Sequence, residues 1–386
     1  MHRWKTRVLH YGAPPTTYGS PSFYKFVWSV LSKSSARRAP DFYPESFDVE
    51  YFIWTKRAFY KIDFKKVYLL DFPVLILTLA KKAIDKDIII TLGFPAIIEL
   101  AILVFIAKIR GVLIFVRDTH WYWPQTRISR FLWPIYFKLL KHVDGILCPG
   151  LASYNYWRKY GFEKVYTVHY YTLEATMIEC NLSREEIRYR LGIRNDEIVI
   201  LYLGRLVKKK GVDIVILAFS RLINENPMLN VKLIIAGDGP ERKRLEEICN
   251  QLGLADKVVF LGAVPEESKK CTYKASDIFV YVPIVAEIPE EWAIAPLEAM
   301  SLGIPTIVST AVGSLPDILH GVIAVKWGDI EELYKAMKEI IENRGLRLKD
   351  YLSKAGLYTY KSLASKTRVK IEVLKAIMYS LKKHER

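Results

Sequence analysis

Cysteine and glutamine are scarce in this 386-residue chain. The first scarcity bears on disulfides, zinc sites and the cellular compartment, and the second bears on the source of the protein. The four cysteines, Cys148, Cys180, Cys249 and Cys271, are scattered and include no CxxC pair. The sequence therefore predicts neither a disulfide framework nor a zinc site, and it favours a reducing, cytoplasmic environment. Glutamine is nearly absent beside plentiful Lys, Glu, Ile and Tyr, a composition that leans towards a thermophilic source.

Long apolar runs are also missing, and we expect no secretory leader. The longest apolar run, residues 94–116, is interrupted by three charged residues and a glycine. It falls short of the roughly 20 apolar residues that a membrane-spanning helix needs. We expect a buried helix, a turn and a buried strand there. The first eleven residues contain three basic residues but no apolar segment, unlike a secretory signal.

Positive charge is abundant and unevenly distributed. The net charge is +16, and residues 1–180 hold 25 Lys and Arg against 14 Asp and Glu, together with seven of the nine tryptophans. A basic, aromatic surface attracts an anionic membrane, so we expect a peripheral position on the inner face of the cell membrane. A solvated basic face would have the same composition. No RNP, KH or helix-turn-helix signature is present, so we expect no nucleic-acid partner.

Short β-rich runs alternate with helical stretches in both halves, which predicts two α/β units with mainly parallel sheets. The boundary is expected near residues 179–184, where Ser183 and Glu186 have the spacing of a capping box. We therefore predict domains at 1–180 and 181–360. The predicted strands are 6–11, 47–54, 66–70, 87–92, 112–117, 145–148, 164–168, 198–203, 231–236, 258–261, 278–282 and 306–309. The predicted helices of the second half are 211–222, 241–252, 265–275 and 296–302.

Two carboxylates in the second half have a spacing that suits ligand binding. Glu290 lies in a polar loop, and Glu298 lies just inside a helix that Pro296 opens. Backbone amides at a helix start attract anions. A phosphate at this helix start would have a carboxylate on either side, each able to reach sugar hydroxyls.

A basic loop follows the first strand of the second half. It contains Gly204, Arg205 and three lysines that end at Lys210. Ligands of open α/β sheets bind outside the carboxyl ends of the strands. A planar guanidinium beside a lysine ammonium suits a diphosphate, whereas Lys208 and Lys209 are predicted to be solvated neighbours.

These segments together resemble the donor-binding domain of glycosyltransferase family 4, a retaining family with the GT-B fold. LGRLVKKKG, IIAGDGPE and VVFLGAVPEE occur in the expected order, and the Glu290-x7-Glu298 segment runs on into LEAMSLGIPTIVST. Residues 311–317 resemble the family's turn that ends in an acidic residue. The resemblance is specific across about 195–330, and it implies an α/β protein with two Rossmann-like domains facing across an interdomain cleft. A C-terminal helix, about 361–386, is expected to cross back onto the first domain.

The resemblance also implies roles for single residues. Arg205 and Lys210 would neutralise the leaving diphosphate, Glu290 would contact the transferred sugar, and Glu298 would bind the donor ribose. In the first domain, a loop glycine and His120 would face the donor. The donor-binding set implied is Gly19, Arg205, Lys210, Glu290, Ala293, Ile294, Ala295 and Glu298. His120, Arg205, Lys210 and Glu290 are the expected catalytic residues.

Two positions depart from the family pattern. Glu291 and Ala293 stand where glycines are usual, so Glu287 or Glu291 is an alternative to Glu290 beside the sugar.

Asp85 and Asp87 form a literal DxD, the metal motif of the other major glycosyltransferase fold, but they precede a predicted strand and lie at the wrong end for a ligand. No other acidic or histidine cluster has metal spacing. We expect no metal or other cofactor.

The resulting hypothesis is a retaining glycosyltransferase that moves a sugar from a UDP- or GDP-type nucleotide sugar to an acceptor. A membrane-associated, lipid-linked acceptor or a surface glycan is expected from the basic, aromatic first half. A nucleotide-sugar epimerase and a catalytically inactive membrane-associated scaffold of the same fold are the alternatives. An epimerase would need no acceptor, and a scaffold would keep its role after Glu290→Gln.

Overall fold

The computed structural model describes residues 6–11, 47–52, 77, 80–81, 83, 86–94, 97–123, 127–168, 179–285, 290, 292–342 and 352–356. The chain divides into two compact units: residues 1–149, 153–171 and 366–386 form the first, and residues 150–152 and 172–365 form the second. The boundary predicted near residues 179–184 comes a few residues after the change at 171–172. The predicted helix at 361–386 lies outside the described residues.

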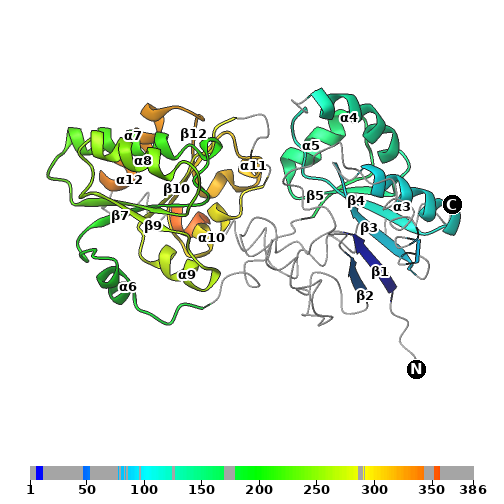
Figure 1. Cartoon of the computed structure of the whole chain (residues 1–386), viewed down its shortest axis with the longest axis horizontal. Coiled ribbons are helices and arrows are strands. Elements are labelled where there is room, and N and C mark those ends of the chain that lie inside the picture. The colour runs from blue at the N-terminus through cyan, green and yellow to red at the C-terminus, as the bar shows by residue number, and fades with distance from the viewer. Residues whose placement is uncertain are drawn as a thin grey trace. The chain divides into compact units, whose positions relative to one another are not determined.

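The described part of the first unit is built on a parallel six-stranded sheet with the order β2-β1-β3-β4-β5-β6 (Figure 1). The sheet reverses its direction of growth between β1 and β3, a switch point of the kind found in open α/β sheets. Its strands are β1 (Thr6–Tyr11), β2 (Phe47–Phe52), β3 (Ile88–Leu92), β4 (Leu113–Arg117), β5 (Gly145–Cys148) and β6 (Val165–Thr167). The helices that follow them are α3 (Ile97–Arg110), α4 (Arg127–Leu140) and α5 (Leu151–Lys159).

The apolar run at 94–116 folds as the sequence predicts, with α3, a turn at Gly111 and then β4. Leu100, Leu103 and Val104 of α3 are buried in the core with Trp133 and Trp157. Of the helices in the described part of the chain, none has the length and apolarity required to cross a bilayer. The predicted buried strand is confirmed in β4, but α3 is buried on one face only, because Ile98, Phe105 and Ile109 are exposed.

The second unit has a parallel six-stranded sheet with the order β12-β11-β10-β7-β8-β9 (Figure 1). Helices α7, α8 and α12 lie on one side of this sheet, and α9 and α10 lie on the other. The strands are β7 (Ile198–Leu203), β8 (Val231–Ala236), β9 (Val258–Gly262), β10 (Ile278–Tyr281), β11 (Thr306–Ser309) and β12 (Ile323–Val325). The helices are α6 (Arg184–Arg190), η4 (Lys208–Lys210), α7 (Val212–Glu225), α8 (Arg242–Gln251), α9 (Glu266–Lys274), α10 (Ala295–Ser301), α11 (Leu315–Ile318), η5 (Leu319–Gly321) and α12 (Ile330–Glu342).

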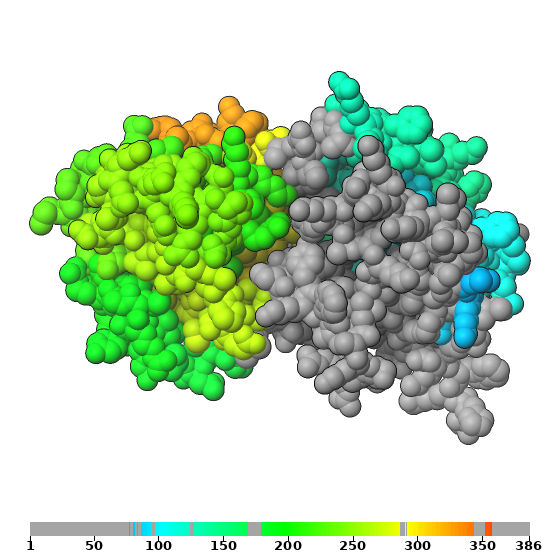
Figure 2. Space-filling view, viewed as in Figure 1, coloured from blue at the N-terminus to red at the C-terminus, as the bar shows by residue number. Residues whose placement is uncertain are grey.

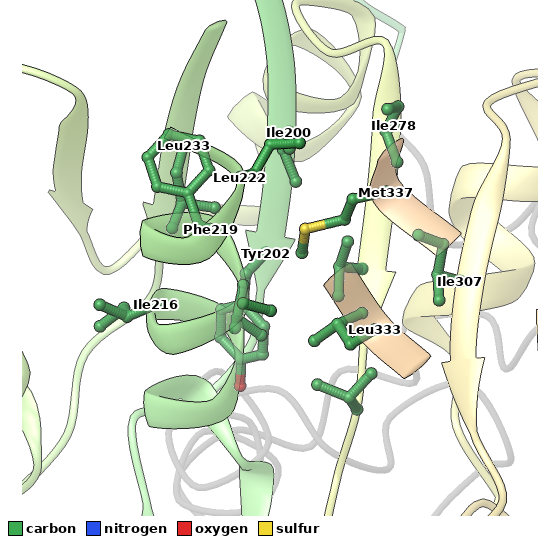
Figure 3. Packing of buried hydrophobic residues seen from close by; sticks show 14 of the residues in the cluster. Ile200, Tyr202, Ile216, Phe219, Leu222, Leu233, Ile278, Ile307, Leu333 and Met337 are labelled. Atoms are coloured by element: carbon green, nitrogen blue, oxygen red, sulfur yellow. The ribbon is translucent and has the colours of Figure 1, made fainter. Parts of the chain in front are cut away.

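The core of the second unit explains why its elements were predictable. All six residues of β7 are buried, which is typical of a central parallel strand covered on both faces. Phe219 and Leu222 of α7 and Leu333 and Met337 of α12 recur at helical spacing and pack against the strands (Figure 3). Periodicity and burial therefore agree throughout this unit.

A glycine-rich turn at residues 237–241, after β8, packs against the basic loop at residues 204–210, after β7. Gly204 N donates to Ala236 O at 2.9 Å, and Leu206 N donates to Asp238 O at 2.9 Å. The two backbones approach so closely that a Cβ on Gly237, whose φ is +143°, would lie 1.8 Å from the Gly204 carbonyl oxygen. The GDGPE sequence is therefore required for packing against the loop that carries Arg205.

We expect Gly237→Ala to lower the free energy of unfolding by about 3 kcal/mol, because it adds a strained φ and a backbone clash. Gly253 provides the matched control, since its φ is +68° but nothing lies within 4 Å of its Cβ position. Gly253→Ala should cost only about 1 kcal/mol. Urea unfolding of both variants measures the difference, and equal losses would refute the role of Gly237.

The cysteine prediction is wrong for one pair, because Cys180 is bonded to Cys271 in α9. Their Cα atoms are 5.3 Å apart although 91 residues separate them in sequence. Packing of α6 against α9 brings the two together, with Ile187 and Ala275 beside them. Cysteine spacing has no bearing on such a tertiary contact, so the cysteine count no longer supports a reducing compartment. The capping box of Ser183 and Glu186 is confirmed at the start of α6.

Candidate functional site

The predicted basic loop lies at the topological switch point of the second sheet. The sheet grows from β7 through β8 to β9 in one direction, and from β10 to β12 in the other. The loops that leave β7 and β10 therefore emerge side by side at the carboxyl edge, where open sheets bind ligands. A backbone hydrogen bond of 2.9 Å from Ile284 N to Lys209 O joins these two loops.

Arg205 and Lys210 have different environments on this loop. The Arg205 side chain is exposed, and its carbonyl oxygen accepts a hydrogen bond of 3.1 Å from the buried Tyr202 hydroxyl. Lys210 ends η4 and is only 7% exposed. The following residue, Gly211, has a φ of +65°, and a Cβ there would lie 2.3 Å from the Val282 carbonyl oxygen. The glycine thus allows the lysine to approach the loop after β10.

The structure brings Lys210 and Glu290 into contact. Lys210 Nζ lies 2.7 Å from Glu290 Oε2, and the Lys210 ammonium also donates to the Tyr281 hydroxyl. That hydroxyl donates to Glu290 Oε1 at 3.1 Å. A lysine, a glutamate and a tyrosine from three different segments thus form a closed hydrogen-bonded triangle.

Backbone contacts hold Glu290 in this position. It forms a parallel bridge with Val312, and its carbonyl oxygen accepts a hydrogen bond of 2.9 Å from Gly313 N. Tyr281 is the last residue of β10 and is almost completely buried. Glu287 and Glu291, the alternatives to Glu290, lie outside the described residues.

The protonation states follow from burial and pairing. Burial lowers the pKa of the Lys210 ammonium, an effect that the Glu290 carboxylate opposes in part. Burial acts to raise the pKa of Glu290, but the charge and hydrogen bond of Lys210 hold that pKa below its usual value. Burial, and then the Glu290 carboxylate, raise the pKa of Tyr281 well above its ordinary value. Glu290 is therefore ionised at neutral pH, and Tyr281 keeps its proton.

Glu298 lies on α10 and is 3% exposed. Its Oε2 accepts a hydrogen bond of 2.8 Å from the Tyr273 hydroxyl, and Lys269 Nζ lies 3.9 Å from its Oε1. Burial raises the pKa of this carboxyl, although Lys269 opposes the effect. The role of Glu298 in binding ribose stays a prediction.

The predicted phosphate-binding amides belong to the start of α10. Ala293 is buried, and Ile294 and Ala295 are half-buried. Ile294 is the residue before the helix, and Pro296 is at the second helical position, as expected for a proline that opens a helix. The three residues follow Glu290 within one short segment, and their contact with phosphate stays a prediction.

In the first unit, His120 belongs to a buried polar cluster around Asp118. Asp118 Oδ1 lies 3.0 Å from His120 Nδ1 and accepts hydrogen bonds from His120 N at 2.8 Å and Trp157 Nε1 at 3.1 Å. The Tyr136 hydroxyl donates to Oδ2. Burial acts to raise the pKa of Asp118, but His120 and the other donors lower it overall. The carboxylate thus fixes the orientation of the histidine ring.

The sequence did not predict two of these groups, Tyr281 and Asp118. Tyr281 ends the run Ile-Phe-Val-Tyr, which is typical of a buried strand and carries no polar signal. Asp118 lies two residues before the predicted His120. The only signal for it in the sequence was its position directly after a buried strand. Gly19, the other first-domain prediction, lies outside the described residues.

The DxD sequence lies at the start of a strand, as predicted. Asp87 immediately precedes β3, at the amino end of that strand, and Asp85 is outside the described residues. Across the described residues there is no group of three or more His, Cys, Asp or Glu side chains that could hold a metal ion. That the reaction needs no metal stays a prediction.

Two α/β units with parallel sheets are the architecture of GT-B glycosyltransferases. The solved structure of Anabaena Alr3699/HepE, in complex with UDP, matches 97% of this chain and 100% of its own with a TM-score of 0.73 at 15% identity. This likeness establishes the fold. It is consistent with the predicted pair of Rossmann-like domains.

Residues 183–357 match the model of the family described as Glycosyl transferases group 1. An uncharacterized glycosyltransferase of Methanocaldococcus jannaschii is 40% identical over 147 residues, which are 37% of this chain and 36% of the relative. The alpha-monoglucosyldiacylglycerol synthase of Streptococcus pneumoniae is 30% identical over 172 residues, 44% of this chain and 38% of the relative. The chain thus spans less than two fifths of the length of these curated relatives.

Proposed function

We propose that this chain is a retaining glycosyltransferase that moves a sugar from a nucleoside-diphosphate donor of the UDP or GDP type to an acceptor hydroxyl. The observation that carries the proposal is the contact between Lys210 and Glu290 at the switch point of the second sheet. A cation for the diphosphate and an anion for sugar hydroxyls are adjacent there. Arg205 begins the same loop and adds an exposed guanidinium.

The proposed reaction breaks the bond between the anomeric carbon and the diphosphate oxygen. Arg205 and Lys210 stabilise the charge that develops on the departing diphosphate. The acceptor oxygen then bonds to the anomeric carbon on the same face, and its proton passes to the leaving phosphate oxygen. In this proposal Glu290 orients the sugar, Glu298 holds the ribose, and amides of Ala293, Ile294 and Ala295 meet the distal phosphate.

The first unit supplies His120 and Gly19 to the donor in this proposal. The Asp118 carboxylate orients the His120 ring, which suits a role in positioning a sugar hydroxyl. Two protein cations serve the diphosphate, so we propose that the reaction needs no metal. Transfer should therefore persist in EDTA.

The proposed acceptor is a lipid-linked or surface glycan at a membrane. The basic and aromatic composition of residues 1–180 supports it, because such surfaces bind anionic lipid headgroups. The name of the Streptococcus pneumoniae relative, alpha-monoglucosyldiacylglycerol synthase, points in the same direction.

The proposal is tested by incubating the purified chain with a panel of nucleotide sugars and a membrane lipid extract. We expect release of nucleoside diphosphate that depends on the extract, and an NMR assignment of the product anomer that equals the donor anomer. Inversion would exclude the proposed stereochemistry. Conversion of the donor without any acceptor would identify an epimerase instead.

A further inference from the structure

Helix α3 of the first unit presents large apolar side chains to solvent. Ile98, Phe105 and Ile109 are 51%, 66% and 68% exposed. They are seven and four residues apart, so they lie along one face of the helix. Other apolar residues of α3, such as Leu103, are buried in the core. A helix that is apolar on both faces is expected to be covered on both.

Helix α4 continues this surface. Ile128, Phe131 and Ile135 are 57%, 76% and 46% exposed, whereas Trp133 and Tyr136 of the same helix are completely buried. The two helices pack against each other. Their strands β3, β4 and β5 follow one another in one direction across the sheet, so right-handed crossovers place both helices on one side. We call the six exposed residues the α3–α4 face; residues of both helices reach the surface in Figure 2 (cyan and turquoise).

Basic side chains accompany the α3–α4 face. Residues 119–143, which contain α4, include no Asp or Glu but carry Arg127, Arg130, Lys138 and Lys141. All four are exposed. A mostly apolar hollow next to α4 is lined by Trp123 and Phe137 together with Lys138 and Lys141. Large apolar residues flanked by Arg and Lys are typical of a helix that lies in a membrane interface.

We propose that the α3–α4 face docks onto an anionic lipid surface, with its six apolar side chains among the acyl chains and its basic residues at the headgroups. Charge favours an anionic lipid surface over a second copy of the chain or its C-terminal segment as the partner of the α3–α4 face. In a symmetric contact with a second copy, the same basic residues would face each other. The C-terminal segment 361–386 of the chain is also strongly basic, with eight Lys and Arg against two Asp and Glu. A negatively charged surface alone complements all of these features.

This inference rests on the proposed function in one respect: docking would bring the enzyme to a membrane-bound acceptor. The docking itself can be measured without any catalysis. Failure to bind lipid would leave nucleotide binding untouched, and failure to bind nucleotide would leave docking untouched.

Sedimentation of the full chain with vesicles tests the proposal. We expect binding to vesicles of equimolar phosphatidylcholine and phosphatidylglycerol, weakened by salt, and no binding to phosphatidylcholine alone. Phe131→Ser should weaken the partition by about tenfold or more through lost apolar burial. Arg127→Glu should weaken it by about tenfold through reversed charge. All three proteins should have the same circular dichroism spectrum and the same urea unfolding transition, which shows that they are folded.

Two exposed residues of the second unit provide matched controls. Met228 is 91% exposed and Lys243 is exposed on α8, so Met228→Ser also replaces an exposed apolar side chain by serine and Lys243→Glu also reverses an exposed positive charge. Both variants should sediment with anionic vesicles like the wild type. The proposal is overturned if the wild type stays in solution with these vesicles at low salt, or if Phe131→Ser binds like the wild type. It is also overturned if Phe131→Ser abolishes self-association while leaving lipid binding intact.

Discussion

Replacing Lys210 with alanine is expected to lower kcat/KM for sugar transfer by about 10²- to 10³-fold. The ammonium is buried beside Glu290 at the switch point, where a charge stabilises a departing diphosphate far better than it would in water. The same change should weaken the binding of the free nucleoside diphosphate, because a diphosphate is the ligand that Lys210 contacts in the proposed mechanism. Steady-state kinetics and calorimetry on one preparation measure both effects.

Lys208 provides the control for this experiment. It lies two residues earlier on the same loop and is exposed, so Lys208→Ala should change both constants by less than about threefold. Equal effects of the two substitutions would indicate a general electrostatic attraction in place of a specific contact. That result would contradict the assignment of Lys210.

Loss of Lys210 should also destabilise the fold, because it leaves the Glu290 carboxylate buried without its cation. The expected cost is about 3 kcal/mol. Adding Glu290→Gln to Lys210→Met should recover part of this cost, since the amide carries no charge. A double variant that is less stable than the sum of the single changes would show that the ion pair is not the source of the loss.

Replacing Glu290 with glutamine is the second large change, and it should separate sugar recognition from diphosphate binding. We expect transfer to fall by about 10²-fold or more, because the carboxylate orients the sugar in the proposed transition state. Binding of the free diphosphate should not weaken. Glu290 competes with a diphosphate for the Lys210 ammonium, so removing its charge favours the anionic ligand.

Glu247, exposed on α8, is the matched control, and Glu247→Gln should leave both measurements unchanged. A Glu290→Gln variant with full transfer activity would remove Glu290 from the mechanism and direct attention to Glu287 or Glu291. A variant that lost diphosphate binding as completely as Lys210→Ala would show that the two residues act as one binding unit.

Between residues 198 and 309 the elements of the second unit could be predicted closely, whereas β12 and α12 were not predicted. Strands β7, β8 and β11 have the predicted bounds, and α8 and α9 differ from the prediction by one residue at each end. These strands are short and apolar, and turn residues separate them from amphipathic helices, so local pattern and tertiary burial agree. The positions of Arg205 and Lys210 after β7 followed from the same pattern.

Contacts between distant segments could not be predicted. Lys210, Tyr281 and Glu290 meet because the sheet places β7 beside β10, and neither strand carries a sign of its neighbour in its own residues. The bond between Cys180 and Cys271 has the same origin. Periodicity determines which face of an element is buried, but pairing across the sheet depends on the whole fold.

The most direct test of the donor site is calorimetric titration of the wild type and Arg205→Ala with UDP, GDP and ADP. The proposed function predicts saturable binding of one nucleotide and a loss of about tenfold or more in the variant, because an exposed guanidinium contacts the diphosphate. Lys243→Ala, a change of an exposed cation on α8, should bind like the wild type. Absence of saturable binding for all three nucleotides would contradict the claim that the carboxyl edge of the second sheet is a nucleotide-sugar site.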